Sequence, residues 1–353
     1  MTESARPPLL LLTTGGTIQG AGAARISQGD YRIGTTPVAQ MLAALPELAS
    51  VAELTVEEIA NVDSVAMTLP ILARLVTRIR QAHASATPPR GIVVTHGTDT
   101  VEETAYLLHL TTGNLGQSTS GWNATSGRVG PGLGFAAQAA PVVLTAAMRP
   151  ATELGADGPV NLWNAVRTAL CPESAGRGVL VALNERIHCP RDVIKFFAQG
   201  VDAFQSPGSG PLGRTDPDAV RYYRRSERRS GADSEFAGLE FAALPRVDII
   251  AAYQEADGAA CAAAEAAGAR GLVVVGPLSP AAKAAALAAA ARGVAVVVCH
   301  RGAGGAVRID AADRSRGLCS GDDLSAAKAR VLLRLALARG VMPGDLPRVF
   351  AEY

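Results

Sequence analysis

The sequence predicts a two-domain α/β protein, with a larger N-terminal domain built on a mainly parallel sheet flanked by helices and a smaller C-terminal α/β domain. Its 353 residues exceed the length of about 100–200 residues that is usual for one domain. Short apolar runs alternate with helical patterns along the chain, which is typical of βαβ units. The runs are continuously apolar, as expected for strands that are covered on both faces.

Each domain has its own series of elements. In the first, apolar runs predict strands at Leu9–Leu12, Gly91–Val94, Val142–Leu144 and Gly178–Leu183, and helical patterns predict helices at Thr68–Ala82, Val101–Leu110 and Pro159–Leu170. In the second, the predicted strands are Val247–Ala251, Gly271–Val275 and Val294–Val298, and the predicted helices are Ala256–Ala267 and Pro280–Arg292. A helix between two strands favours parallel pairing of those strands.

Two stretches interrupt this alternation. Gly113–Ala140 is rich in Gly, Ser, Asn and Thr and too long for an ordinary connection, so we expect a surface insertion that forms a hairpin or is partly disordered. Arg214–Leu244 carries interleaved arginines and acids, which favours a solvated linker over a nucleic-acid-binding patch. The predicted boundaries are therefore 1–213 for the first domain, 214–244 for the linker and 245–353 for the second domain.

The composition excludes several classes of partner. The 33 basic residues balance 32 acidic ones, which disfavours nucleic acid and anionic membranes as partners. No segment approaches about 18 uninterrupted apolar residues, and the first ten residues do not resemble a signal peptide, so we expect a cytoplasmic protein. Five widely spaced cysteines without a CxxC pair predict neither a disulfide framework nor a structural metal.

Two loops that follow predicted strands are candidates for chemistry. Thr13-Thr14-Gly15-Gly16-Thr17 follows the first strand, and Thr95-His96-Gly97-Thr98-Asp99-Thr100 follows the second. Ligands of open α/β sheets bind at such strand exits, and glycines let a backbone approach a ligand closely. The alternatives are a plain turn or phosphate loop for the first segment, and for the second a helix N-terminus at Asp99 with a structural His96.

The same residues resemble the bacterial-type L-asparaginases, a family that includes the glutaminase-asparaginases. The resemblance covers nearly the whole chain outside the insertion and is carried by TTGGTI at 13–18, THGTDTVEETAYLL at 95–108, AAMRP at 146–150, DGPVNLWNAV at 157–166, PRDVIK at 190–195, SPGSGPLG at 206–213 and KARVLLRLAL at 328–337. It implies a site between the N-terminal domain of one subunit and the C-terminal domain of another, in a tetramer of intimate dimers.

The resemblance also implies roles for particular residues. Thr17 is implied as the nucleophile that attacks the side-chain amide of asparagine, with Tyr31 on a lid. Thr98, Asp99 and Lys195 match the family's Thr-Asp-Lys triad. The sequence does not decide which threonine forms the covalent bond, and we favour Thr17. Only Lys195, Lys283 and Lys328 are lysines among the 33 basic residues; an arginine could not exchange a proton at the triad position.

Further residues are implied as substrate contacts. Ser64, with Asp63 beside it, matches the serine that binds the α-carboxylate, although a helix N-cap before Thr68–Ala82 is an equally good interpretation. Asp99 is implied to contact the substrate's α-ammonium. Gly16, Gly97, Thr98 and Ala147 are expected to supply backbone contacts or an oxyanion hole.

The chain departs from the family at three positions. Val65 stands where many members have Gln, Ser279 is at best a short substitute for the Asn that crosses between subunits, and Asp310 is the acid nearest to the expected crossing Glu. We therefore expect a cofactor-free asparaginase with little glutaminase activity. The alternatives are an amidohydrolase for another amide and a catalytically silent amino-acid-binding protein.

Overall fold

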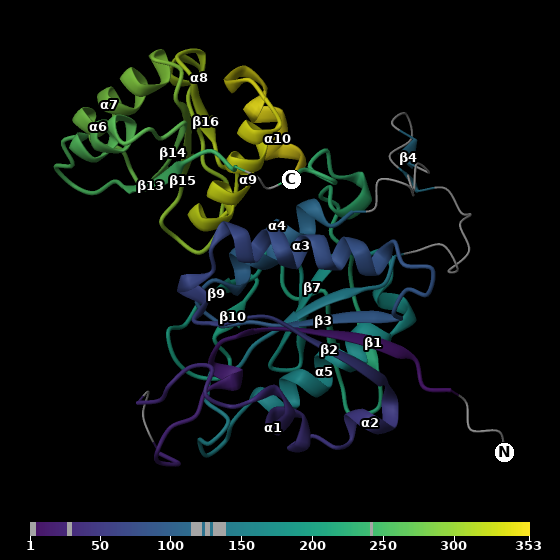
Figure 1. The fold of residues 1–353 in the computed structure, drawn as a ribbon. Coiled ribbons are helices and arrows are strands. Elements are labelled where there is room, and N and C mark those ends of the chain that lie inside the picture. Colours follow the sequence, from purple (N-terminus) through teal and green to yellow (C-terminus); the bar gives the residue numbers. More distant parts are fainter. Residues whose placement is uncertain (1–4, 27–29, 114–121, 124–127, 130–138, 241–242) are drawn as a thin grey trace. The chain divides into compact units, whose positions relative to one another are not determined.

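A computed structural model describes residues 5–26, 30–113, 122–123, 128–129, 139–240 and 243–353. The chain divides into two compact units, Met1–Gly238 and Leu239–Tyr353. Figure 1 shows that each unit has a sheet of its own with helices against it. The two-domain α/β prediction is confirmed.

The first unit contains a mixed sheet of eight strands. In spatial order these are β12 (Val220–Tyr222), β11 (Gly213–Thr215), β8 (Arg186–His188), β7 (Val179–Leu183), β6 (Val142–Thr145), β3 (Gly91–Thr95), β1 (Pro8–Gly15) and β2 (Glu53–Val62). The pairs from β2 to β7 are parallel, and those from β7 to β12 are antiparallel. The carboxyl ends of β1, β3 and β6 therefore meet at one edge of the sheet.

Helices cover both faces of this sheet (Figure 1). Helices α3 (Leu69–His83) and α4 (Val101–Thr111) lie on one face, and α1 (Val38–Ala43), α2 (Leu48–Val51) and α5 (Gly158–Leu170) lie on the other. The core under α5 includes Leu11, Val93 and Val143, one residue from each of three adjacent strands. Burial of these apolar strands on both faces explains their unbroken apolar runs.

Short elements complete the first unit. They are the 3₁₀ turns η1 (Thr17–Gln19), η2 (Ser64–Ala66), η4 (Pro172–Ser174) and η5 (Gly231–Asp233), and a two-stranded antiparallel ribbon of β9 (Ile194–Lys195) and β10 (Phe204–Gln205). Arg186 of β8 holds this ribbon through an ion pair of 2.8 Å with Asp202 and a hydrogen bond of 3.0 Å to Gln205.

The second unit has a parallel sheet of four strands, β13 (Val247–Ala251), β14 (Gly271–Val275), β15 (Ala295–Cys299) and β16 (Leu318–Ser320). Its helices are α6 (Ala259–Ala266), α7 (Pro280–Ala291), α8 (Ala311–Ser315), α9 (Ala326–Ala338) and α10 (Leu346–Glu352), with the 3₁₀ turn η6 (Pro343–Asp345) before the last. Every strand and helix predicted for the two domains is present, with shifts of a few residues at the ends.

The predicted linker at 214–244 needs correction. Its first residues form β11 and β12 of the large sheet, and the first unit extends to Gly238. The interleaved charges lie at the surface, as expected for solvated groups, and some of them pair: Arg221 contacts Asp216 at 3.0 Å and Asp218 at 2.6 Å. The predicted insertion at 113–140 lies mostly outside the described residues. Within it, β4 (Trp122–Asn123) pairs with β5 (Arg128–Val129) in antiparallel fashion.

Candidate active site

The two threonine-rich loops meet at the carboxyl edge of the large sheet. The hydroxyl of Thr14 donates to the carbonyl of Thr95 at 2.9 Å, and the N–H of Gly16 donates to the carbonyl of Val62 at 3.1 Å. The N–H of His96 donates to the carbonyl of Thr145 at 2.9 Å. These bonds fix the loops after β1 and β3 to the ends of the neighbouring strands β2 and β6.

Two glycines let the loops come together. Gly16 has a φ of 82°, and a β-carbon there would lie 2.5 Å from both Cα and N of Gly97. Only a residue without a side chain fits this approach, and the left-handed conformation also favours glycine. The expectation that Gly16 and Gly97 bring backbone to the site is consistent with this geometry.

The hydroxyl of Thr17 has a partner at hydrogen-bond distance. Thr17 begins η1, is only 5% exposed, and its Oγ1 lies 2.7 Å from the phenolic oxygen of Tyr31. The tyrosine comes from the segment predicted to form a lid. Backbone bonds between Ala21 and Arg32 close this segment, of which residues 27–29 lie outside the described part.

The side chains of the predicted triad, Thr98, Asp99 and Lys195, also lie close together. The ammonium of Lys195, on β9, donates to Oγ1 of Thr98 at 2.9 Å and to Oδ1 of Asp99 at 2.5 Å. The side chain of Lys195 is 17% exposed, whereas that of Asp99 is 57% exposed. The carboxylate therefore reaches solvent while the lysine and Thr98 are largely enclosed, an arrangement in which a proton can move between the amine and the hydroxyl.

Ser64 lies against Gly97, because a β-carbon on that glycine would be 2.9 Å from Oγ of Ser64. The Ser64 hydroxyl is buried and has no hydrogen-bond partner among the described residues. The alternative role as the N-cap of the helix at 68–82 is wrong. Asp63 caps η2 by accepting from the Val65 N–H, and Thr68 precedes α3. An unpaired buried hydroxyl at this edge is suited to bind a polar group of a ligand.

The loop after β6 is held by residues that the predicted site did not include. The carboxylate of Asp157 accepts from the N–H groups of Met148 and Arg149 at 2.9–3.1 Å, and Nδ2 of Asn161 donates to the carbonyl of Ala146 at 3.0 Å. These contacts fix the backbone on both sides of Ala147, which is fully buried. Asp157 and Asn161 both lie in the DGPVNLWNAV motif, which is the sequence signal that could have identified them.

Comparison with known proteins agrees with this geometry. The family model described as "Asparaginase, N-terminal" matches residues 8–118 and 133–228, and that described as "Glutaminase/Asparaginase C-terminal domain" matches residues 246–350. The chain belongs to the asparaginase family. The part that the N-terminal model skips, 119–132, falls inside the predicted insertion.

Individual members of the asparaginase family match over nearly the full chain. "L-asparaginase 2" of Bacillus subtilis is 37% identical over 98% of this chain and 87% of its own length. A probable periplasmic L-asparaginase of Haemophilus influenzae is 35% identical over 98% of this chain and 93% of its own. The crystal structure of a probable cytoplasmic L-asparaginase from Campylobacter jejuni has a TM-score of 0.88 and 34% identity, covering 99% of this chain and 100% of that one.

Ser279 and Asp310, the two residues predicted in place of the family's subunit-crossing Asn and Glu, lie in the second unit of this asparaginase-family chain. The hydroxyl of Ser279 caps α7, accepting from the Ala282 N–H at 3.0 Å and donating to the Ala256 carbonyl. Asp310 caps α8 by accepting from the Asp313 N–H at 2.7 Å. Both side chains thus have local structural roles, and their contact with substrate stays a prediction.

Within the described residues, no three His, Cys, Asp or Glu side chains gather as metal ligands would. The helices of that same part of the chain include none that is both long and apolar enough to cross a membrane.

Proposed function

We propose that this chain hydrolyses the side-chain amide of L-asparagine to L-aspartate and ammonia, with Thr17 as the nucleophile and an acyl-enzyme as intermediate. The observation that carries the proposal is the 2.7 Å contact between Oγ1 of Thr17 and the Tyr31 hydroxyl. A threonine hydroxyl is a weak nucleophile unless a neighbouring group accepts its proton. The names of the full-length relatives point to the same substrate.

In the first step Thr17 Oγ1 attacks the amide carbon and its proton passes to the Tyr31 oxygen, while the proton of the Tyr31 hydroxyl moves on to the amide nitrogen. The negative charge that develops on the amide oxygen is stabilised by the N–H groups of Gly97 and Thr98, which donate to no acceptor in the described part of the chain. The C–N bond then breaks, and ammonia leaves with a proton returned to its nitrogen.

In the second step water hydrolyses the ester on Thr17 and restores its hydroxyl. Thr98 and Lys195, joined by a 2.9 Å hydrogen bond, are placed to orient this water and to pass its proton. Asp99 holds the lysine through one carboxylate oxygen. The rest of that exposed carboxylate is available for the α-ammonium of the substrate, and the unpaired Ser64 hydroxyl is available for its α-carboxylate.

The residue after Ser64 supports a low glutaminase activity. Val65 is 69% exposed, and its side chain has no group that could hydrogen-bond to a substrate. A missing hydrogen-bond partner costs about 0.5–1.5 kcal/mol, which weakens binding several-fold without abolishing it. The longer and more flexible glutamine depends more on such contacts for its position, so we propose asparagine as the preferred substrate.

We further propose a homotetramer of intimate dimers in the cytoplasm. The family resemblance supports the assembly, with Ser279 and Asp310 facing a neighbouring subunit's site. The Campylobacter protein is described as a probable cytoplasmic L-asparaginase, and the Haemophilus relative is described as a probable periplasmic one. Sedimentation tests the assembly, because full activity in a monomeric species would contradict a shared site. Fractionation of the native cells tests the location.

A coupled ammonia assay tests the activity with asparagine, glutamine, D-asparagine and small asparaginyl peptides as substrates. We expect release of ammonia from asparagine, a much lower kcat/KM for glutamine, and loss of turnover in Thr17→Ala. Comparable kcat/KM for glutamine would contradict the proposed specificity. An inactive wild type that binds aspartate tightly would instead support the silent binding protein.

A further inference from the structure

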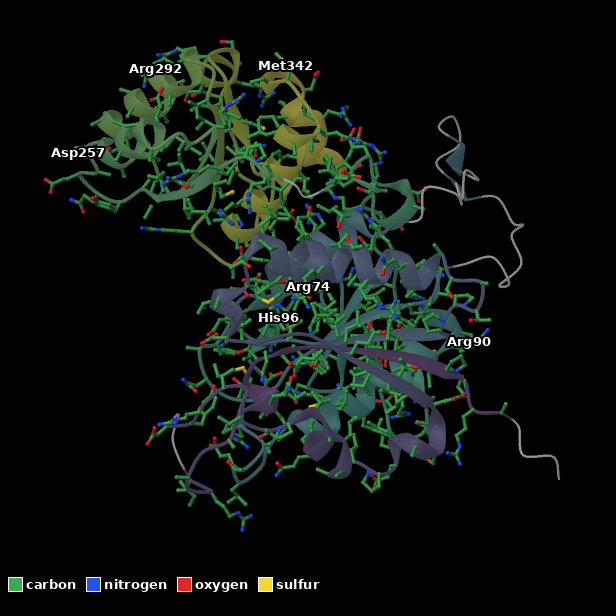
Figure 2. All side chains as sticks on the ribbon, viewed as in Figure 1. Arg74, Arg90, His96, Asp257, Arg292 and Met342 are labelled. Atoms are coloured by element: carbon green, nitrogen blue, oxygen red, sulfur yellow. The ribbon has the colours of Figure 1, made fainter. Side chains whose placement is uncertain are left out.

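His96 lies between the end of β3 and the Gly97-Thr98 pair, and the proposed mechanism gives it no role. Figure 2 marks it inside the first unit. Its ring is wholly buried, and Nδ1 lies 2.8 Å from the carbonyl oxygen of Gly97, the next residue. Its Nε2 is also buried and has no hydrogen-bond partner among the described residues.

The hydrogen bond defines the tautomer of the ring. A carbonyl oxygen only accepts, so Nδ1 must carry the proton. Burial lowers the pKa of His96 to about 4, and the ring is therefore neutral near pH 7, with a bare lone pair on Nε2. Burying an acceptor that has no donor is unfavourable, and an apolar side chain of similar size would avoid it. The Nδ1–H is therefore the one polar group of this ring that makes an interaction in the described part of the chain, and any role of the side chain beyond packing falls on it.

That donor acts on a single peptide unit. The carbonyl of Gly97 and the N–H of Thr98 belong to the same planar group, and no cis peptide occurs in the described part of the chain. In a trans peptide these two groups point in opposite directions. A hydrogen bond that fixes the carbonyl therefore also fixes the direction of the Thr98 N–H.

We propose that His96 is a positioning residue that aims the Thr98 N–H at the oxyanion of the reacting amide. The inference rests on the proposed function, since that N–H is one of its two oxyanion donors. A preorganised donor stabilises the transition state more than the ground state, so loss of the ring donor lowers kcat and leaves KM nearly unchanged. The ring does not itself touch the substrate.

Three substitutions separate this role from packing. In Asn the amide nitrogen is as many bonds from the backbone as Nδ1, whereas in Gln it is one bond further, and Leu has no donor. We expect His96→Gln and His96→Leu to lower kcat about 10- to 100-fold with KM changed less than about 3-fold. We expect His96→Asn to restore kcat to within about 5-fold of wild type. Assays are run well below the thermal midpoint of each variant.

Each result has a definite meaning. The proposal is overturned if Asn loses as much kcat as Gln, if Leu keeps wild-type kcat, or if the loss falls mainly on KM. Where His96→Leu does not fold, the comparison of Asn with Gln decides. Activity that survives in Thr17→Ala overturns the proposed nucleophile instead, whatever the His96 variants do.

Discussion

Gly16 and Gly97 approach each other so closely that the loops after β1 and β3 form one surface. A β-carbon on Gly16 would lie 2.5 Å from Gly97 Cα. Thr17 and Thr98 each follow one of these glycines, so this contact sets the spacing between the proposed nucleophile and the proposed water-activating group.

We therefore expect Gly16→Ala to separate the loops and to lower kcat/KM for asparagine by about 100-fold or more, since misplacement by about 1 Å costs that much. Gly208→Ala is the matched control. Gly208 has a φ of 79°, close to that of Gly16, but open space around it. Gly208→Ala therefore introduces similar backbone strain without the clash. Equal losses of kcat/KM in Gly16→Ala and Gly208→Ala would contradict the explanation that the loops are separated.

Tyr31→Phe removes the hydroxyl next to Thr17 and keeps the ring, which lies against Gly20. We expect kcat to fall about 100-fold or more, because general base catalysis contributes about 10²–10⁴. Tyr223→Phe, at a side chain that is 64% exposed, should leave kcat unchanged. Stopped-time ammonia assays measure both, and normal turnover in Tyr31→Phe would exclude the phenol as proton acceptor.

Lys195→Arg keeps a positive charge beside Asp99 but supplies a planar group that does not give up its proton. We expect most of the activity to be lost while the thermal midpoint stays close to wild type. Lys283→Arg is the control, because Lys283 also pairs with an aspartate, Asp313, in the second unit. A near-wild-type rate in Lys195→Arg would remove this lysine from the proton path.

The apolar strands and the loops that follow them could be predicted because their signals are local. Continuous runs such as Gly91–Thr95 are buried on both faces, and the loop after such a strand must lie at the sheet edge. The strand β2 could not be predicted in this way. It is an edge strand whose residues, ELTVEEIANV, are mostly exposed or half-buried, so it lacks an apolar run.

Contacts between distant residues were also beyond the sequence. The family resemblance brought Thr98, Asp99 and Lys195 together, and no local pattern would have done so across 96 residues. The clamp of Asp157 on the Met148 and Arg149 N–H groups depends on how α5 packs against β6. The cap interpretation of Ser64 was wrong because the chain makes a separate 3₁₀ turn before α3.

The buried His109 of α4 predicts an acid-sensitive fold. Burial lowers the pKa of His109 to about 4, although the negative charge of Asp192 acts to raise it. In the unfolded chain the pKa is near 6.5. The unfolded state therefore binds an extra proton between about pH 6.5 and pH 4, and the free energy of unfolding falls as the pH falls through this range. Below about pH 4 this contribution to the free energy of unfolding is fully lost, and it amounts to about 3 kcal/mol.

His109→Asn tests this dependence. The Asn oxygen can replace Nδ1 as acceptor for the Val179 N–H but does not titrate. Urea unfolding at several pH values gives the free energy of unfolding as a function of pH. We expect this free energy to change less steeply with pH in the variant, by up to about one proton. His300→Asn, at a partly exposed position, is the control. An unchanged slope in His109→Asn would contradict the assignment.

The central claim is that Thr17 carries the acyl group while Thr98 serves its hydrolysis, and peptide mass mapping of a quenched reaction tests it most directly. In Thr98→Ala mixed with asparagine, slow deacylation should leave an aspartyl group on the peptide that contains Thr17. An aspartyl group on the Thr98 peptide of Thr17→Ala, with continued release of ammonia, would contradict the account.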